Sequence, residues 1–295
     1  MGWVRRAAGV AAAVLVGWLG AVGAAGAAPA LWRVSDADSE IYLFGTLHAL
    51  SPDARWRTPV YDEVYERAST LWFEADVEGA DPAAVQALID RYGADRKRRL
   101  SQKLSPADLK ALARQVDVKR VDHLRPWAAA LMLSMQPVLD RGATVEAGAD
   151  YAMTRVARQE AKQIRTFETL EDQARMFAGL PEPAEVRYLA DVIHERAATS
   201  RAAPPAVEPV NLEAAWLSGD LARLGPGLVG GLKADNPAFY DALLKRRNLA
   251  WAETLAETLQ GSGVDLVNVG ALHLIGEDGL PALLAGRGFA VERIQ

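Results

Sequence analysis

The sequence predicts an α/β fold, in which a mixed β-sheet has parallel inner strands and helices cover its faces. Three observations lead to this prediction. Short apolar segments alternate with longer segments of helical periodicity, as in βαβ units. A Gly-x-Leu-His motif follows one apolar segment near the start of the chain and another near its end. The chain has 295 residues, half of them apolar, which is enough to bury a full globular core.

The first thirty residues are predicted to be an export signal. Arg5 and Arg6 precede an apolar run over residues 7–21, and small residues suited to signal peptidase follow. An uncleaved membrane anchor is the alternative, because no charged residue lies between Arg6 and Arg33. The second half of this segment is rich in Ala and Gly, which favours cleavage. We therefore expect a signal peptide at residues 1–30 and a periplasmic or secreted mature protein.

Charge and cysteine content exclude several classes of protein. The net charge is −5, which argues against nucleic acid as the main partner, since phosphate binding requires a clustered positive surface. The basic run at residues 96–99 is expected to be the solvated face of a helix. Cysteine is absent, so disulfides, thiolate metal sites and cysteine nucleophiles are excluded. Beyond residue 30 no apolar run reaches membrane length, so we expect no stable membrane span after signal cleavage.

The mature chain begins with a predicted β-hairpin. Strand-forming residues at 31–34 and 41–44 flank a polar turn. The second strand runs directly into Gly45, where glycine allows a sharp turn and a close backbone approach to a ligand. His48 is therefore expected just past the end of a strand, which is where ligands collect in α/β proteins.

Two further strands are predicted to end in a carboxylate. A helix at about residues 59–68 precedes an apolar strand at 71–76, which indicates parallel pairing. Glu74 interrupts this strand, and it is either exposed to solvent or paired, hydrogen-bonded or bound to a metal. Residues 163–168 form a similar strand that ends in Glu168.

The remaining pattern is mainly helical. A large helical region is predicted at about residues 81–160, followed by helices at 183–198 and about 237–259. The last of these carries Arg246 and Arg247. One arginine on its inner side would serve a carboxylate or a developing oxyanion, whereas a salt bridge at the surface is the alternative.

Two familiar motifs are rejected on their context. Residues 225–230 match the glycine spacing of dinucleotide-binding proteins, but the segment before them is helical, so a loop is predicted there. His194 and Glu195 begin a metalloprotease helix pattern, but Ala198 stands where the second histidine is required.

The last inner strand is predicted at residues 265–269, before a closing strand at 289–294. The inner strand ends in the second motif, which contains Gly270 and His273. The chain has only four histidines, so two of them in matched contexts are informative. If both motifs end inner strands, the fold brings the two imidazoles together, which suggests a metal site or a catalytic cleft.

Taken together, these motifs resemble the TraB/PrgY/GumN family, which includes the Tiki ectodomains. The resemblance spans the mature chain and implies a single domain over residues 31–295. Its fold is expected to be similar to that of the erythromycin esterase and ChaN-like proteins. The matching segments are the two Gly-x-Leu-His motifs, Leu31-Trp32-Arg33-Val34, Arg247-Asn248, and residues 276–280 and 287–293.

The resemblance implies a metal-dependent hydrolase of peptidase type, acting on a peptide or a related amide or ester. It assigns His48, Glu74 and His273 as ligands of a divalent metal ion. Without sulfur ligands, such a site suits manganese, cobalt or zinc, and the ion lowers the pKa of a bound water. Glu168 is then expected to act as general base or to orient the ligands, and Arg247 to stabilise the oxyanion.

Two other functions stay open at this point. The same cleft would suit a non-catalytic protein that binds a peptide, a pheromone or a haem-like ligand. The third possibility is a scaffold without chemistry, in which His48 and His273 only pack against each other at the strand ends.

Overall fold

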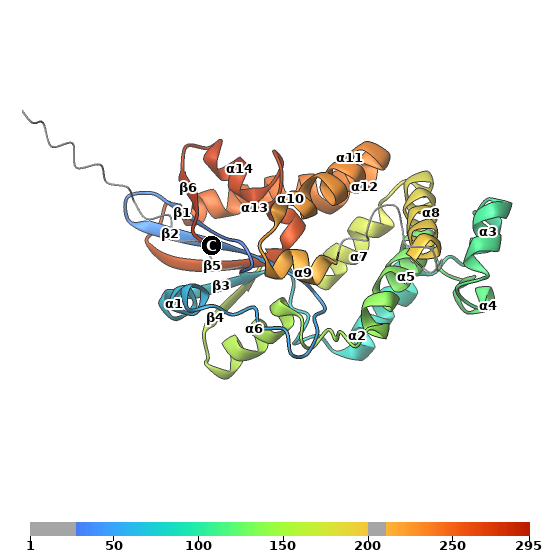
Figure 1. The fold of residues 1–295 in the computed structure, drawn as a ribbon, viewed down its shortest axis with the longest axis horizontal. Helices are drawn as coiled ribbons and strands as arrows, with labels where there is room; N and C mark the ends of the chain where they lie inside the picture. The colour runs from blue at the N-terminus through green and yellow to red at the C-terminus, as the bar shows by residue number, and fades with distance from the viewer. Residues whose placement is uncertain (1–27, 200–210) are drawn as a thin grey trace, which may run out of the picture.

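The computed structural model describes residues 28–199 and 211–295, and the predicted signal peptide lies outside them up to residue 27. The described chain forms a six-stranded sheet between two layers of helices, and a helical region extends from one end of the sheet (Figure 1). Within the described residues, no helix has both the length and the apolar character needed to cross a membrane.

The sheet is mixed, and its inner strands are parallel, as the sequence predicted. Its strand order is β4-β3-β5-β2-β1-β6. The strands β2, β5, β3 and β4 pair in parallel, whereas β1 pairs antiparallel with both β2 and β6. The predicted hairpin is the β1–β2 pair. The strand bounds are β1 (Leu31–Ser35), β2 (Ser39–Thr46), β3 (Thr70–Phe73), β4 (Gln163–Thr166), β5 (Gly263–Gly270) and β6 (Ala290–Arg293).

Several helices begin where the sequence supplies a capping side chain. Thr58, Ser105 and Thr169 each accept a hydrogen bond from a backbone N–H in the first turn of a helix. The α-helices are α1 (Pro59–Arg67), α2 (Pro82–Leu88), α3 (Pro106–Leu112), α4 (Val118–Val121), α5 (Pro126–Asp140), α6 (Ala149–Gln159), α7 (Leu170–Ala178), α8 (Glu182–Thr199), α9 (Leu212–Leu217), α10 (Leu221–Leu224), α11 (Gly231–Asp235), α12 (Pro237–Tyr240), α13 (Arg246–Thr258) and α14 (Leu280–Ala285). Shorter 3₁₀ or π-helical turns are η1 (Ile89–Gly93), η2 (Leu100–Gln102), η3 (Gly225–Gly230), η4 (Asp241–Lys245) and η5 (Ala271–Leu274).

Alternating side chains of the strands pack into two cores, one on each face of the sheet. Tyr42 and Phe44 of β2 pack in a core with residues of α1, α6 and α9. Ile41 and Leu43 of the same strand pack in a core with residues of α13 and α14. All four side chains are at most 3% exposed, and burying one apolar side chain fully contributes roughly 1.5–3 kcal/mol. The inner strands are thus covered on both faces, as parallel strands require (Figure 1).

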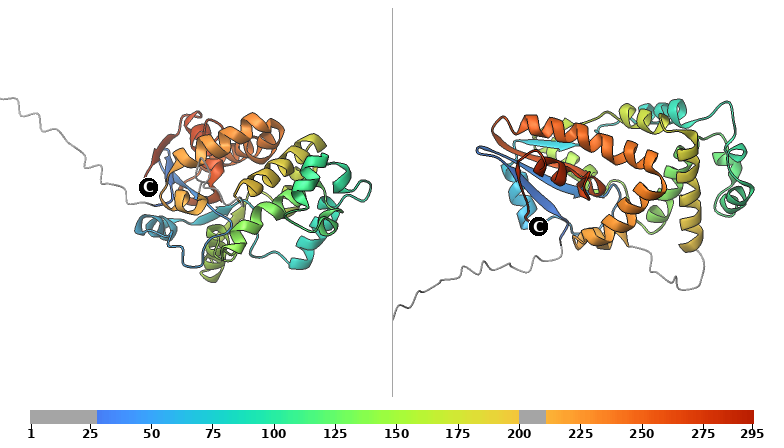
Figure 2. Two further views of the ribbon diagram at one scale, coloured as in Figure 1. Left: turned by 45° about the vertical axis from the view of Figure 1, so that its right-hand side comes forward. Right: turned by 90° about the horizontal axis from the view of Figure 1, so that it is seen from above.

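A third core lies beyond the sheet, among helices α3, α4, α5 and α8 (Figure 2). Leu112, Leu133 and Leu189 are at most 1% exposed in this core. The predicted helical region covered residues 81–160. Helix α8 lies after this range but contributes to the third core, whereas α6, at the end of the range, packs on the sheet. The helical region is therefore built from segments on both sides of β4 and α7.

The structure corrects two local predictions. Residues 225–230 were predicted as a loop, but they form the π-helical turn η3 between α10 and α11. The helices on either side continue through this segment, so tertiary context overrides the preference of glycine for loops. Residues 96–98 are exposed, as predicted, but they form a bend between η1 and η2 and no helix. The carboxylate of Asp95 accepts the backbone N–H groups of Lys97 and Arg98, which competes with helix formation.

Candidate functional site

The candidate residues follow the carboxyl ends of the inner strands, and the strand register brings these ends together. Thr46 of β2 pairs with Gly270 of β5, and Phe73 of β3 pairs with Thr166 of β4. Side chains just beyond these positions therefore meet at one edge of the sheet. The candidates that follow these strand ends are His48, Glu74, Glu168 and His273.

Arg247 of α13 lies between the two carboxylates, with its side chain 9% exposed. Its Nη2 donates to Glu74 Oε2 at 2.5 Å and to Glu168 Oε2 at 2.9 Å, and its Nε donates to Glu168 Oε1 at 2.8 Å. Its Nη1 donates to the carbonyl of Leu243 at 3.0 Å and to His273 Nε2 at 3.0 Å. These bonds use all the N–H donors of the guanidinium.

The two neighbouring arginines have different environments. Arg247 is the inner arginine that the sequence predicted, and it serves two carboxylates. Arg246 carries the surface salt bridge that was the alternative: it is 66% exposed and pairs with Asp241 at 2.7 Å. A pair of this kind contributes little, whereas breaking a buried pair is costly.

Glu74 is largely buried and each of its oxygens accepts a hydrogen bond, which agrees with the paired alternative and excludes the solvent-exposed one. Its Oε1 accepts the backbone N–H of Gly270 at 2.7 Å, and its side chain is 12% exposed. Burial by itself raises the pKa of Glu74, but the cationic groups around it and the Gly270 hydrogen bond hold that pKa well below its usual range. The backbone N–H of Glu168 donates to the carbonyl of Glu74 at 2.9 Å, which fixes the two carboxylates side by side.

His273, in η5, is a buried neutral imidazole. Asn248 Nδ2 donates to the carbonyls of His273 and Asp278, at 3.3 and 2.7 Å, which leaves Asn248 Oδ1 as an acceptor. The Nδ1 of His273, 2.6 Å from that oxygen, therefore carries the proton and Nε2 presents a lone pair. Burial lowers the pKa of His273 to about 3. The Trp251 ring packs against the imidazole, with ring centroids 4.5 Å apart.

His48 lies at the open side of the cluster. Its Nδ1 is 2.9 Å from Asp150 Oδ2, and the charge of Asp150 raises the pKa of His48 to about 9. Because 59% of the His48 side chain is exposed, water screens this attraction. A Cβ at Gly148 would lie 2.3 Å from the carbonyl oxygen of His48, so only glycine allows α6 to approach so closely.

Both motif glycines lie where the packing is tight. A Cβ at Gly270 would lie 3.1 Å from Glu74 Oε1, 3.7 Å from His48 Nε2 and 3.7 Å from His273 Cδ2. The carboxylate and both imidazoles thus surround one point. A Cβ at Gly45 would lie 3.0 Å from the Cα of Ala271. The sharp turn predicted at Gly45 is wrong, because β2 continues through Gly45 to Thr46.

The nitrogen and oxygen donors of the site suit a divalent cation. The side chains would have to move before they could hold one. Within the described residues, no three His, Asp or Glu side chains form a ready ligand group. Arg247 instead donates hydrogen bonds to Glu74 Oε2 and His273 Nε2. Three carboxylates, those of Glu74, Glu168 and Asp150, share this one arginine and His48. Asp150 Oδ1 is buried without a hydrogen-bond partner among the described residues, as expected beside a cation or water site.

Two residues of the site were not predicted from the sequence. Asp150 and Asn248 fix the Nδ1 sides of the two imidazoles, as the outer partners of metal-binding histidines do. Asn248 directly follows Arg247 on the same helix, and this position was the sequence signal that could have identified it. The sequence gives no such signal for Asp150, because its contact with His48 depends on how α6 packs against the loop after β2.

Comparisons with known proteins place the chain among related sequences. The model of the TraB/PrgY/gumN family matches residues 30–293. The uncharacterized protein YbaP of Escherichia coli K12 is 25% identical over 266 residues, which cover 87% of this chain and 92% of YbaP. The YbaP protein of Shigella flexneri is 26% identical over 253 residues, covering 82% and 87%. No solved structure matches the chain, so the likeness to erythromycin esterase and ChaN-like folds stays a prediction.

Proposed function

The chain belongs to the TraB/PrgY/gumN family, and from this premise we propose that it is a metal-dependent hydrolase of a peptide or a related amide or ester. The observation that carries the proposal is the convergence on Gly270. Two imidazole rings and one carboxylate lie within 4 Å of a single point at the carboxyl edge of a parallel sheet, where α/β enzymes place their chemistry.

His48 Nε2, His273 Nε2 and Glu74 are the groups proposed to hold the ion. With nitrogen and oxygen ligands only, manganese, cobalt and zinc are the candidates. When bound, such an ion would supply a Lewis acid and a water of lowered pKa. Asp150 and Asn248 would keep each imidazole in the orientation that turns Nε2 toward the site.

Glu168 and Arg247 are proposed to position the site. Both oxygens of Glu168 accept from Arg247, which favours the orienting role of this carboxylate over that of a general base. Arg247 has no free N–H for a developing oxyanion. Its bond to the neutral carbonyl of Leu243 is weaker than its bonds to carboxylates, so we propose that substrate binding exchanges this one.

The proposed substrate lies outside the cytoplasm. The support is the N-terminal pattern of two arginines, an apolar run and small residues, which is typical of a cleaved export signal. A peptide or small-molecule substrate also agrees with the net negative charge, which disfavours nucleic acid.

Metal analysis of the purified chain tests the proposal. About one equivalent of manganese, cobalt or zinc is expected in the wild type after loading, because ligand sets of this kind hold one ion. The ion should be lost in His48→Ala and in His273→Ala. His194→Ala is the matched control, since His194 is 60% exposed and pairs with Asp108 far from the site. The loaded wild type should hydrolyse a fluorogenic peptide or ester mixture, and a chelator should stop it.

Two results would contradict the proposal. One is a wild type that binds none of the three metals, and the other is full metal retention in both site variants. Metal binding without hydrolysis of any peptide, amide or ester would contradict the proposed hydrolase activity and would support the metal site alone.

One observation favours a second candidate, a non-catalytic binding protein for a peptide, pheromone or haem-like ligand. The network around Arg247 is satisfied by protein groups alone, so the fold does not need an ion for stability. A Soret band after haem addition, or stoichiometric capture of an uncleaved peptide, in the metal-free chain would support this candidate.

A further inference from the structure

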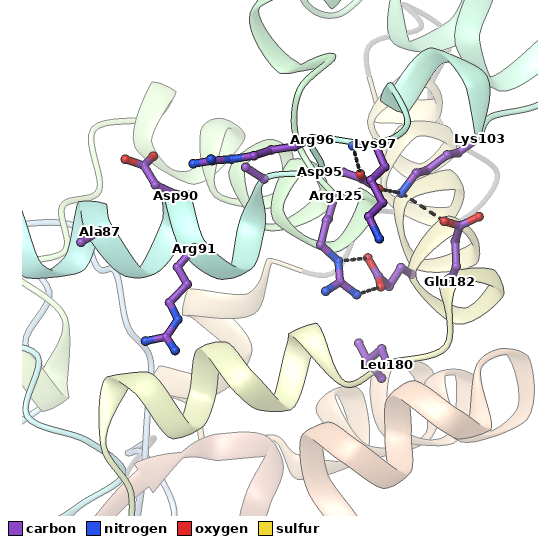
Figure 3. A pocket seen from close by; sticks show the side chains of 12 residues that line it. Ala87, Asp90, Arg91, Asp95, Arg96, Lys97, Lys103, Arg125, Leu180 and Glu182 are labelled. Carbon is purple, nitrogen blue, oxygen red and sulfur yellow. Dashed lines mark hydrogen bonds and ion pairs between the residues drawn. The ribbon is translucent and has the colours of Figure 1, made fainter.

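A cavity of about 880 Å³ lies in the helical region, between η1, the bend that follows it, the start of α5 and the start of α8 (Figure 3). None of the residues of the strand-end site lines it. Helix α7 separates the two places: Gln173 faces Glu74 at 3.5 Å, whereas Glu171 accepts from Tyr92 of η1 at 2.6 Å. The volume of the cavity is in the range of small-molecule sites.

Ion pairs that each contain one buried member form the wall of this cavity. Lys103 has a side chain only 2% exposed, and its Nζ donates to Asp95 at 2.6 Å and lies 3.1 Å from Glu182. Glu185 is 1% exposed, and both of its oxygens accept from Arg125. Charges buried this deeply are stable only when paired, so the wall is held in a fixed geometry. These pairs also neutralise the carboxylates that they contain.

Cationic groups without partners face the same space. Arg96 and Lys97 have exposed side chains, and neither forms a side-chain hydrogen bond or ion pair with the described residues. Figure 3 shows the Lys97 side chain extending from the bend toward Arg125. Nη1 of Arg125 likewise has no hydrogen-bond partner in the described chain, because its bonds to Glu185 use Nε and Nη2.

The backbone holds these cations over the cavity. Asp95 Oδ1 accepts the N–H groups of Lys97 and Arg98 at 2.8 and 3.0 Å, and its other oxygen binds the buried Lys103. The bend is thus fastened to the wall, and the side chains of Arg96 and Lys97 are carried at its rim. Arg98 and Arg99 of the basic run pair with Glu182 and Asp122, whereas Arg96 and Lys97 have no such partner among the described residues. Two unpaired cations beside a cavity of ligand size indicate a binding role.

We propose that this cavity binds a small organic anion through carboxylate or phosphate groups. Lys97 supplies a mobile ammonium, and Arg125 and Arg96 supply planar guanidinium donors, which bind both kinds of oxyanion. The site is independent of the strand-end site and of the hydrolase proposal.

Calorimetric titration of the full chain tests the site. The probes are citrate for the carboxylate source and tripolyphosphate for the phosphate source, at constant ionic strength set with sodium chloride. We expect saturable binding of at least one probe with one-to-one stoichiometry. Arg96→Ala combined with Lys97→Ala should weaken it by about tenfold or more, because hydrogen bonds to charged groups have at least this effect. Lys97→Arg should retain binding.

The matched control removes the same charge elsewhere in the helical region. Lys119→Ala combined with Arg120→Ala deletes two adjacent exposed cations that do not line the cavity, and it should leave the affinity unchanged. Binding of citrate alone assigns the carboxylate source, and binding of tripolyphosphate alone assigns the phosphate source. Failure of both probes at millimolar concentration, or an equal loss in the control pair, would overturn the proposal.

Discussion

Arg247 is shared by two carboxylates and one imidazole, so its removal would leave several buried groups without a partner. We predict that Arg247→Met destabilises the chain by about 3–5 kcal/mol, as expected when one member of a buried ion pair is lost. Urea unfolding in the presence of a chelator measures this without any contribution from bound metal. The expected cause is the uncompensated charge of Glu74 and Glu168.

Arg246→Met provides the control at the adjacent position. Its side chain is 66% exposed, so its substitution should change the unfolding free energy by less than about 0.5 kcal/mol. Similar effects of the two substitutions would show that the Arg247 network does not stabilise the fold.

At the scale of the residue, strand-end positions were predictable and their outer partners were not. His48, Glu74, Glu168 and His273 could be named because each lies at or just past the end of a predicted strand, and parallel strands end at the same edge. Asp150 could not, because its contact with His48 depends on how α6 lies against the loop after β2. That packing depends on Gly148, whose importance appears only when the backbone approach is seen.

Among the elements, the bend at residues 96–98 depends on a single carboxylate. The hydrogen bond from Lys103, together with two backbone N–H groups, lowers the pKa of Asp95 from its ordinary value of 3.8. A group with a lowered pKa in the folded state stabilises the fold fully above its ordinary pKa, and this contribution is lost as the pH falls below it. The stabilisation by Asp95 should therefore begin to fall below about pH 3.8 and be lost only as the pH passes through its lowered pKa.

Asp95→Asn tests this pH dependence. At neutral pH the variant should be less stable than the wild type by about 1–3 kcal/mol, since the buried Lys103 loses a charged acceptor. The difference should shrink as the pH is lowered through and below 3.8, which denaturant titrations at several pH values would show. Exposed Asp53, changed to Asn, is the control. A stability difference between the variant and the wild type that stays constant through the acid range would contradict the role given to Asp95.

Element boundaries were predicted less well than element types, for a physical reason. The strands expected at residues 71–76 and 163–168 end at Phe73 and Thr166. Backbone pairing continues beyond these ends, with Phe167 N donating to Phe73 O at 3.0 Å, but the side chains of Glu74 and Glu168 turn to Arg247. The local pattern could not show that these two side chains would meet a distant arginine.

The core of the helical region shares no residue with the two cores of the sheet, and this suggests two units of different stability. One unit is the sheet with its covering helices, and the other is the helical region around Leu112. The sequence predicted the three-layer arrangement, because strand and helix patterns alternate locally. It did not predict that α8 would join the helical region, because that contact crosses β4 and α7.

Native-state hydrogen exchange tests whether the units open separately. If the helical region opens first, its amides exchange from a state that keeps the sheet intact, whereas the amides of β2 and β5 require global unfolding. Leu266→Ala, in the sheet core, should then lower the protection of the sheet amides by about 2–5 kcal/mol and leave the helical amides unchanged, because Leu266 stays packed when the helical region opens. Leu112→Ala should lower the protection of both sets, because its contacts are lost in either opening. A loss of helical protection in Leu266→Ala would mean that the three cores unfold as one unit.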